Sequence, residues 1–182
     1  NQYLGDLHHG RWEILYNPVD CTQFTPRPHA TVNANPVILM AGTDAVNHQR
    51  EALAIMHYVQ RERPTATLRL LSQYHHHDAP ALFREADVFL HLKYWDPCPT
   101  VVLEALASGV PVVHNGTGGT AELVTGRSGI GVANYDTASA AILRILDEWP
   151  TYAEAARHAS LRYNLTPWLQ RHTEIFETVR AT

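Results

Sequence analysis

The chain has 182 residues, of which 45% are hydrophobic and 18% are charged, and its formal net charge is −4. This composition is typical of a globular domain with its own core and excludes a disordered chain. The sequence has no block of Lys and Arg that would offset phosphates, which argues against a nucleic-acid surface. It also has no apolar run long enough to span a membrane.

The cysteines and histidines bear on location and metal binding. Cys21 and Cys98 are far apart and lack metal-binding spacing, so we expect reduced thiols and a cytoplasmic protein. The triplet His75–His77 stands beside Asp78, but without a second ligand cluster a solvated loop is favoured over a metal site. The chain begins with Asn1 and has no signal peptide, so we expect a piece of a longer protein.

Strand and helix patterns alternate along the first half of the chain. The apolar run 36–42 ends in Gly42 and predicts a buried parallel strand. Apolar residues then recur at helical spacing over residues 47–61, and Pro64 ends that helix. The pattern continues with a strand at 67–71, a short helix at 79–85 and a strand at 87–92.

The alternation continues to the end of the chain. A helix over residues 100–108 closes at Gly109, and a short strand follows at 110–113. After a turn at Gly118 and Gly119, the remaining patterns predict a helix at 120–124, a strand at 129–132 and helices near 138–145, 152–162 and 167–180. We therefore predict an α/β fold with a Rossmann-like parallel sheet sandwiched by helices.

Three parts of the chain are expected to have different roles. Residues 1–20 are predicted to be an inter-domain segment, 21–165 the Rossmann-like domain, and 166–182 a C-terminal helix. That helix has an apolar stripe that packs either on this domain or on a partner domain absent from the chain, and we favour the partner. The stripe consists of Trp168, Leu169, Ile175, Phe176 and Val179.

The densest chemical signal lies between Asp96 and Val113. Glu104 stands in a helix whose neighbouring residues are all apolar, so its carboxylate is expected to face a polar partner or a ligand. A salt bridge or a solvent-facing edge is the alternative. Asp96 lies eight positions earlier, just before the helix, so the helix N-terminus with the N–H groups of residues 100–102 falls between the two acids. This layout suits a nucleoside diphosphate sugar, which has a ribose, a diphosphate and a hexose in series.

The segment resembles the E-x7-E region of glycosyltransferase family 4, a group of retaining transferases with the GT-B fold. The resemblance is carried by several ordered motifs and covers the chain from about Ile14 to its end. These motifs are Tyr16-Asn-Pro-Val-Asp20, Ala86-Asp-Val-Phe-Leu90, the two acids, Gly109-Val-Pro-Val-Val113 and Gly118-Gly-Thr-Ala-Glu122-Leu-Val124. It implies the donor-binding, C-terminal half of such an enzyme, with a preceding acceptor-binding domain.

The resemblance also implies roles for individual residues. Glu104 would hold the ribose hydroxyls, Asp96 would hold hydroxyls of the transferred sugar, and N–H groups near Thr100 and Val101 would meet the diphosphate. Gly118 and Gly119 would let the backbone approach the donor closely, whereas Glu122 is interpreted as a structural support. Such enzymes need no metal or cofactor. The full-length protein would be cytoplasmic, either free or peripheral to the inner face of the membrane, and would act in polysaccharide biosynthesis.

The sequence departs from the family pattern at the phosphate grip. The family usually places Arg after the glycine that ends the first long strand and Lys a few residues later, whereas this chain has Thr43 after Gly42 and His48 near the Lys position. Arg50 or Lys93 is expected to reach the phosphates instead, with protonated His48 helping at low pH. Pro99 also stands where the family often has glycine, and it donates no N–H.

Two functions are therefore kept open. The first is the donor-binding half of a transferase, which alone would catalyse little. The second is a degenerate transferase that serves as a binding or scaffold module, which Thr43 and His48 favour. A nicotinamide-dependent dehydrogenase is set aside because no G-x-G-x-x-G follows the first strand.

Overall fold

A computed structural model describes residues 14–28, 31–71 and 74–180, with backbone alone for residues 42–47. Five parallel strands form one sheet in the order β2-β1-β3-β4-β5. The strands are β1 (Val37–Ala41), β2 (Thr67–Leu71), β3 (Val88–His91), β4 (Val112–His114) and β5 (Gly129–Gly131). The strand order reverses direction between β1 and β3, which creates a topological switch point at the carboxyl edge of the sheet.

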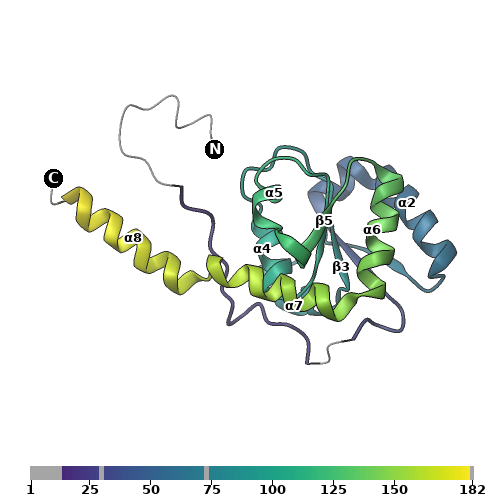
Figure 1. The fold of residues 1–182 in the computed structure, drawn as a ribbon, viewed down its shortest axis with the longest axis horizontal. Coiled ribbons are helices and arrows are strands. Elements are labelled where there is room, and N and C mark those ends of the chain that lie inside the picture. The colour runs from purple at the N-terminus through teal and green to yellow at the C-terminus, as the bar shows by residue number, and fades with distance from the viewer. Residues whose placement is uncertain (1–13, 29–30, 72–73, 181–182) are drawn as a thin grey trace.

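Helices cover both faces of the sheet (Figure 1). One face carries α2 (Gly42–Glu62) and α6 (Tyr135–Asp147), which pack against each other. The other carries α3 (Ala79–Glu85), α4 (Thr100–Ala107) and α5 (Thr120–Leu123), while α7 (Trp149–Ser160) packs on α4 and runs toward α8 (Leu165–Arg180). Short 3-10 turns occur at His76–Asp78, Gly126–Ser128 and Leu161–Tyr163. The predicted α/β sandwich is confirmed.

The strands feed two separate hydrophobic clusters because successive side chains of a strand point to opposite faces. In β1, Ile38 and Met40 pack under α2 and α6, whereas Leu39 packs under α3 and α4. In β4, Val112 and Val113 divide in the same way. Both faces are buried, which explains why the strands are continuous apolar runs rather than alternating ones.

Several element bounds differ from the predicted ones. The helix expected over 47–61 begins directly after β1 at Gly42, and its backbone departs from helical geometry at His48. Residues 43–46 lack the apolar periodicity of the later turns, so the sequence pattern missed this first part. Strand β4 begins at Val112 instead of 110, after Pro111, whose carbonyl accepts the N–H of Phe89 at 2.9 Å. The helices near 138–145 and 152–162 begin three residues earlier than predicted, at Tyr135 and Trp149.

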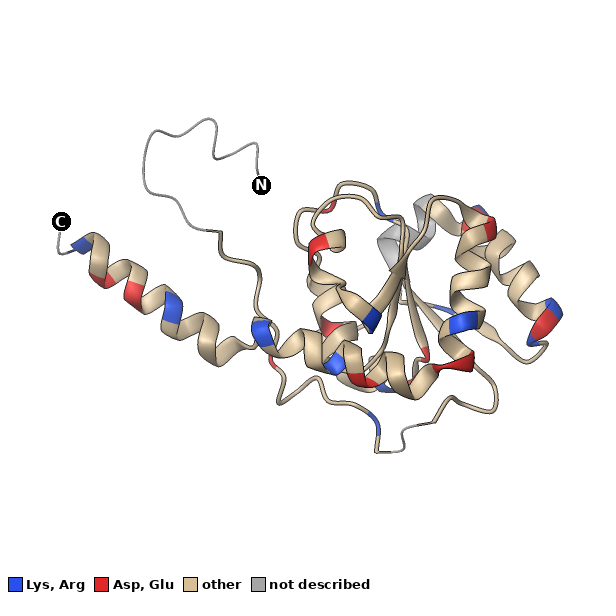
Figure 2. Ribbon diagram, viewed as in Figure 1, with Lys and Arg blue, Asp and Glu red and all other residues tan. Residues whose placement is uncertain are grey.

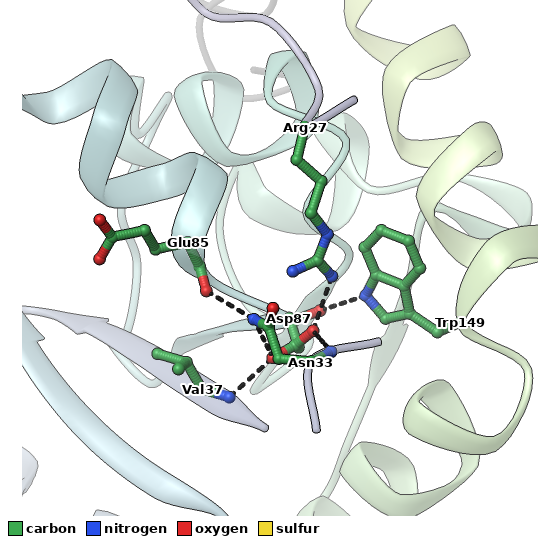
Figure 3. Close-up of polar contacts among 6 residues, drawn as sticks. All are labelled: Arg27, Asn33, Val37, Glu85, Asp87 and Trp149. Atoms are coloured by element: carbon green, nitrogen blue, oxygen red, sulfur yellow. Dashed lines mark hydrogen bonds and ion pairs between the residues drawn. The ribbon is translucent and has the colours of Figure 1, made fainter. Parts of the chain in front are cut away.

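A buried polar cluster holds the amino edge of the sheet together, at the end opposite the switch point (Figure 3). Asp87 precedes β3 and is fully buried. Its carboxylate pairs with Arg27 Nη2 at 2.6 Å and accepts N–H groups from Asn33 and from Val37 at the start of β1. The Arg27 guanidinium also lies 4.1 Å from the centre of the Trp149 ring, whose N–H donates to the Asp87 carbonyl. The cluster therefore joins residues 27–33, β1, β3 and α7.

Residues 16–19, near the start of the described chain, lie beside residues 163–168, where α8 begins. The N–H of Val19 donates to the carbonyl of Tyr163, and the N–H of Leu165 donates back to Val19. Trp168 Nε1 donates to the carbonyl of Tyr16 at 2.8 Å. Beyond this contact α8 extends away from the sheet (Figure 1), and its apolar residues Leu169, Phe176 and Val179 are exposed. Docking of this helix on a partner domain stays a prediction.

The described residues bear on three kinds of functional surface: a patch of one charge, a membrane-spanning helix and a metal site. Lys and Arg are interspersed with Asp and Glu along α8 and over the sheet-covering helices (Figure 2). Within the ranges that the structure describes, no helix is both long and apolar enough to cross a membrane. Over the same ranges, His, Cys, Asp and Glu side chains form no group of three or more that could hold a metal ion.

Candidate functional site

The candidate site lies at the switch point, where β1, β3 and β4 end. The loop over residues 92–99 follows β3 and leads into α4, and the loop over residues 115–119 follows β4 and leads into α5. Asn115 joins the two loops because its side-chain amide donates to the Leu92 carbonyl at 2.8 Å. Ligands of open α/β sheets bind at this place.

Asp96 is held in position by both loops. Its carboxylate pairs with Lys93 Nζ at 2.9 Å, and the side chain retains 14% of its exposure. Its backbone carbonyl accepts the N–H of Gly119 at 2.8 Å. Lys93, which was predicted to reach the phosphates, therefore contacts the acid in this structure, and its phosphate role stays a prediction.

The two glycines allow the loops to approach each other closely. A Cβ atom on Gly119 would lie 1.8 Å from the Pro97 carbonyl oxygen, and one on Gly118 would lie 2.6 Å from that of Asp96. Gly118 also has a φ of 64°, which favours glycine. The structure thus gives these glycines a role in placing Asp96, and their predicted contact with the donor stays a prediction.

Glu104 lies on the second turn of α4 and is 8% exposed. Its Oε2 atom is buried and forms no hydrogen bond with any described residue. Burial raises the pKa of this carboxyl, and a nearby His76 opposes that rise. Burial, reinforced by the charge of Glu104, also raises the pKa of Tyr74. The salt-bridge alternative is therefore not observed among the described residues, and Tyr74 and His76 lie close enough to the Glu104 carboxyl to interact with it electrostatically.

The raised pKa of Glu104 predicts a stability effect. A carboxyl whose folded-state pKa exceeds its unfolded-state pKa contributes stability below the unfolded-state value and loses it as the pH rises through the folded-state value. We therefore expect Glu104→Gln to raise the free energy of unfolding at pH 7 by about 1 kcal/mol, the lower end of the cost of an unsatisfied buried polar group. Urea denaturation at pH 7 and below pH 4 measures this effect, with exposed Glu154→Gln as control. A gain that is equal at both pH values would contradict the pKa argument.

The N-terminus of α4 lies between the two acids in sequence and offers two of the three expected N–H donors. Pro99 is its N-cap residue, and the N–H groups of Thr100 and Val101 precede the first intrahelical hydrogen bonds. The N–H of Val102, in contrast, already donates to the Pro99 carbonyl at 3.2 Å. The predicted set of three donors is thus reduced to two, because a tight first turn takes up the third.

The other predicted donor-binding residues lie on α2. Gly42 and Thr43 are its first two residues, but their side chains lie outside the described part of the structure. His48 stands at the helix kink, with its ring centre 6.0 Å from that of Tyr94 in the loop after β3. Arg50 is exposed, and among the described residues it forms no ion pair with either acid. His48 is therefore closer to the Asp96 loop than the sequence indicated.

Sequence reasoning missed two buried histidines at the same edge. His91 ends β3 and His114 ends β4, and the two are paired in register. Burial lowers the pKa of His91 to about 4, with Asp96 raising it and His114, Lys93 and His48 lowering it, and burial also lowers the pKa of His114. Both rings are therefore neutral at pH 7. Their position at the carboxyl ends of neighbouring strands was a signal that could have identified them.

Glu122 was interpreted as a structural support, and its contacts agree with that interpretation. Its carboxylate accepts the Tyr16 hydroxyl at 2.6 Å, and this hydrogen bond raises the pKa of Tyr16 to about 12. Its carbonyl accepts Arg162 Nη2 at 2.9 Å. Asn17 in turn bonds the Cys98 carbonyl at 2.8 Å. The segment around Tyr16 therefore braces both α5 and the loop that contains Asp96.

Comparison with known families decides the class of protein. Residues 31–162 match the family described as glycosyl transferases group 1. The chain belongs to this glycosyltransferase family. The matched region contains the switch point, both acids of the candidate site and all five strands.

Named glycosyltransferases share part of this region. The chain is 30% identical over 106 residues to the glycogen synthase of Mycobacterium tuberculosis (strain H37Rv), which covers 57% of this chain and 26% of the relative. It is 33% identical over 99 residues to the lipopolysaccharide core biosynthesis mannosyltransferase LpsB of Rhizobium meliloti (strain 1021). This match covers 52% of this chain and 28% of the relative. The matches thus span about a quarter of the length of these curated glycosyltransferases.

Solved structures show the same fold. A sucrose-phosphate synthase from Thermosynechococcus elongatus superposes with a TM-score of 0.69 at 18% identity, covering 91% of this chain and 52% of that one. The C-terminal domain of the glycosyl transferase group 1 family protein LpcC from Francisella tularensis gives 0.67 at 12% identity, covering 81% of this chain and 100% of that one. This chain therefore has the fold of the C-terminal domain of GT-B glycosyltransferases.

Proposed function

We propose that the chain is the donor-binding half of a retaining glycosyltransferase, which moves a sugar from a nucleoside diphosphate sugar to a hydroxyl acceptor. The observation that supports this most is the Glu104 carboxylate, which is buried in α4 with one oxygen unsatisfied by any described residue. A buried carboxylate in that state is costly unless a ligand donates to it. Two adjacent ribose hydroxyls are suitable donors.

The neighbours of the two acids support an order for the donor along α4. Glu104 is buried in α4, within electrostatic reach of Tyr74 and His76, whereas Asp96 pairs with Lys93 in the loop after β3. The Thr100 and Val101 N–H groups lie between the acids in sequence. We therefore place the ribose at Glu104, the diphosphate at the start of α4 and the transferred sugar at Asp96.

The proposed reaction depends on positioning and charge stabilisation. The acceptor hydroxyl attacks the anomeric carbon on the face from which the diphosphate leaves, so the configuration is retained. The bond between the anomeric carbon and the phosphate oxygen breaks, its electron pair stays with the diphosphate, and the leaving diphosphate oxygen takes up the proton of the acceptor hydroxyl. The helix N-terminus stabilises that charge, with Lys93 and Arg50 as further candidate cations and His48 as a further candidate contact. We propose that neither a metal nor another cofactor takes part.

A second domain is needed for this chemistry. We propose that an N-terminal acceptor-binding domain, which is not part of this chain, closes over the switch point. The site would then lie between the domains, and this chain alone would bind donors weakly and transfer little. The exposed apolar side of α8 and the segment around Tyr16 are where the chain would meet that domain.

Replacing Asp96 separates sugar recognition from nucleotide recognition. We expect Asp96→Ala to leave the affinity for the free nucleoside diphosphate within about twofold and to weaken binding of the intact donor about tenfold, since one charged hydrogen-bond acceptor is lost. Isothermal titration with both ligands measures the difference, and Asp147→Ala, a distant exposed acid, is the control. Equal loss for the two ligands would contradict the assignment of Asp96 to the sugar.

The proposed function is tested by titrating the chain with UDP-, ADP- and GDP-sugars and by assaying the longer protein for transfer. We expect one base to be preferred, and we expect NMR of the product to show retained anomeric configuration. Inverted product would contradict the retaining mechanism. Donor binding without transfer by the longer protein would instead support the degenerate binding module.

A further inference from the structure

Trp95 has an unusual conformation in the loop that leads to Asp96. Its side chain is 78% exposed, and its φ is 57°, in the left-handed region that bulky residues rarely adopt. Exposure forgoes the burial that normally stabilises a tryptophan, and the backbone conformation adds a steric cost. Neither local preference nor packing therefore explains this side chain, which makes a role in binding worth considering.

The contact between the two site loops imposes this conformation. The Trp95 N–H donates to Thr117 Oγ1 at 3.3 Å, and a Cβ atom on Gly118 would lie 3.0 Å from the Trp95 carbonyl carbon. The next residue, Asp96, is fixed through its carbonyl by Gly119. The loop backbone is thus held on both sides of the tryptophan, and its ring stays on the surface beside Asp96.

We propose that Trp95 is an acceptor-binding residue whose ring stacks on the apolar C–H face of a sugar ring in a carbohydrate acceptor. The proposal rests on the proposed transferase function. An indole has a broad and rigid apolar face, and sites that bind small polar ligands combine such faces with a few placed polar groups. The Asp96 carboxylate and the Lys93 ammonium supply polar groups within two positions of the ring.

Asp96 and Trp95 are neighbours in the loop but differ in solvent exposure, which assigns Asp96 to the donor and Trp95 to the acceptor. Asp96 keeps 14% of its side-chain exposure and lies in the loop after β3, which ends at the buried His91, so it is at the edge of the sheet where we place the donor. Trp95 is its neighbour and faces solvent. A residue that faces outward beside the transferred sugar is placed to meet the molecule that receives it.

The surroundings of Trp95 favour a sugar over a protein surface. The same loop carries the Lys93–Asp96 ion pair within two positions of Trp95 in sequence, together with Tyr94, which is 55% exposed. The centre of a protein–protein interface is usually depleted of such charges. Exposed aromatic faces in a loop with charged groups are better matched to a ligand that has apolar C–H groups and many hydroxyls.

The test observes the Trp95 indole N–H by NMR, assigned through its loss in Trp95→Phe, while maltotriose or mannotriose is added to the chain saturated with nucleoside diphosphate. We expect the Trp95 resonance to shift while those of Trp149 and Trp168 stay in place. In the longer transferase, with the same oligosaccharides as acceptors, we expect Trp95→Ala to raise the acceptor KM about tenfold and to leave the donor KM within about twofold. Trp95→Tyr should restore most of the loss, and exposed Tyr58→Ala should have no effect.

Trp95→Asn distinguishes the effect of losing the ring from the effect of changing the strained backbone, because asparagine tolerates the left-handed conformation. We expect it to behave like Trp95→Ala. An acceptor KM restored by asparagine, or no resonance shift with either sugar, would overturn the proposal. The proposal would also be overturned if the Trp95 resonance shifted only when the remaining domain of the transferase was present and not when a sugar was added. Trp95 would then be a contact between the two domains. Failure of the proposed function is distinguishable, since wild type would then either bind no nucleoside diphosphate sugar or, in the longer protein, bind it without transferring the sugar.

Discussion

Glu104→Ala is expected to lower the affinity of the chain for every nucleoside diphosphate and nucleoside diphosphate sugar about 100-fold. The variant loses a carboxylate that we place on two ribose hydroxyls, and each charged hydrogen bond contributes roughly 1.5–3 kcal/mol. Because the ribose is common to all donors, the loss should not depend on the transferred sugar. Isothermal titration with the free diphosphate and with the intact donor measures it.

Glu104→Gln refines this prediction. The amide keeps the shape but donates on one side, so it can accept only one hydroxyl, and we expect an affinity between those of wild type and the alanine variant. The same substitution is expected to stabilise the fold at neutral pH because Glu104 is a buried acid with a raised pKa. Lower affinity together with higher stability indicates a residue retained for binding. Exposed Glu154→Ala, which should change neither property, is the control.

Asp87→Ala is expected to lower the free energy of unfolding by about 3–5 kcal/mol. Its removal leaves the Arg27 guanidinium without its carboxylate partner and removes the acceptor of the Val37 N–H, and an uncompensated buried charge costs about that much. Urea denaturation followed by circular dichroism measures the effect. We expect Asp147→Ala, which breaks an exposed ion pair with Arg63, to cost less than about 1 kcal/mol.

The location of Asp87 gives this prediction a second readout. The cluster lies at the amino edge of the sheet, whereas the candidate donor site lies at the carboxyl edge. Under conditions where Asp87→Ala is still folded, its donor affinity should match that of wild type. A small loss of stability, or a selective loss of donor affinity without unfolding, would contradict the interpretation of the cluster as purely structural.

The sequence was sufficient to predict the layers of the fold. Buried parallel strands are continuous apolar runs, and residues 36–42 and 87–92 have no competing interpretation once helical periodicity appears between them. The bounds of α2 and β4 were less predictable. Helix α2 has a kink at His48, and β4 begins only after Pro111. Packing against neighbouring elements decides how far each element extends past such a residue, and the local sequence pattern does not.

The candidate site was only partly predictable. Glu104 was singled out because a charge in an apolar helix is conspicuous, and Asp96 because it stands eight positions earlier, just before that helix. His91 and His114 were missed because histidine in a strand resembles an ordinary core residue until the register shows the two residues paired on neighbouring strands. Three-dimensional contacts also showed packing of Gly118 against the Asp96 backbone and an ion pair between Lys93 and Asp96, which the sequence did not indicate, while the predicted donor contacts of both residues stay predictions.

The most direct test of the account combines Glu104→Ala with a change in the ligand. The nucleoside diphosphate that binds best is compared with its 2′,3′-dideoxy analogue by isothermal titration, on wild type and on the variant. We predict that removing the ribose hydroxyls weakens binding to wild type about 100-fold and to the variant less than about threefold, since the partner carboxylate is already gone. Equal losses in both proteins would show that Glu104 does not hold the ribose.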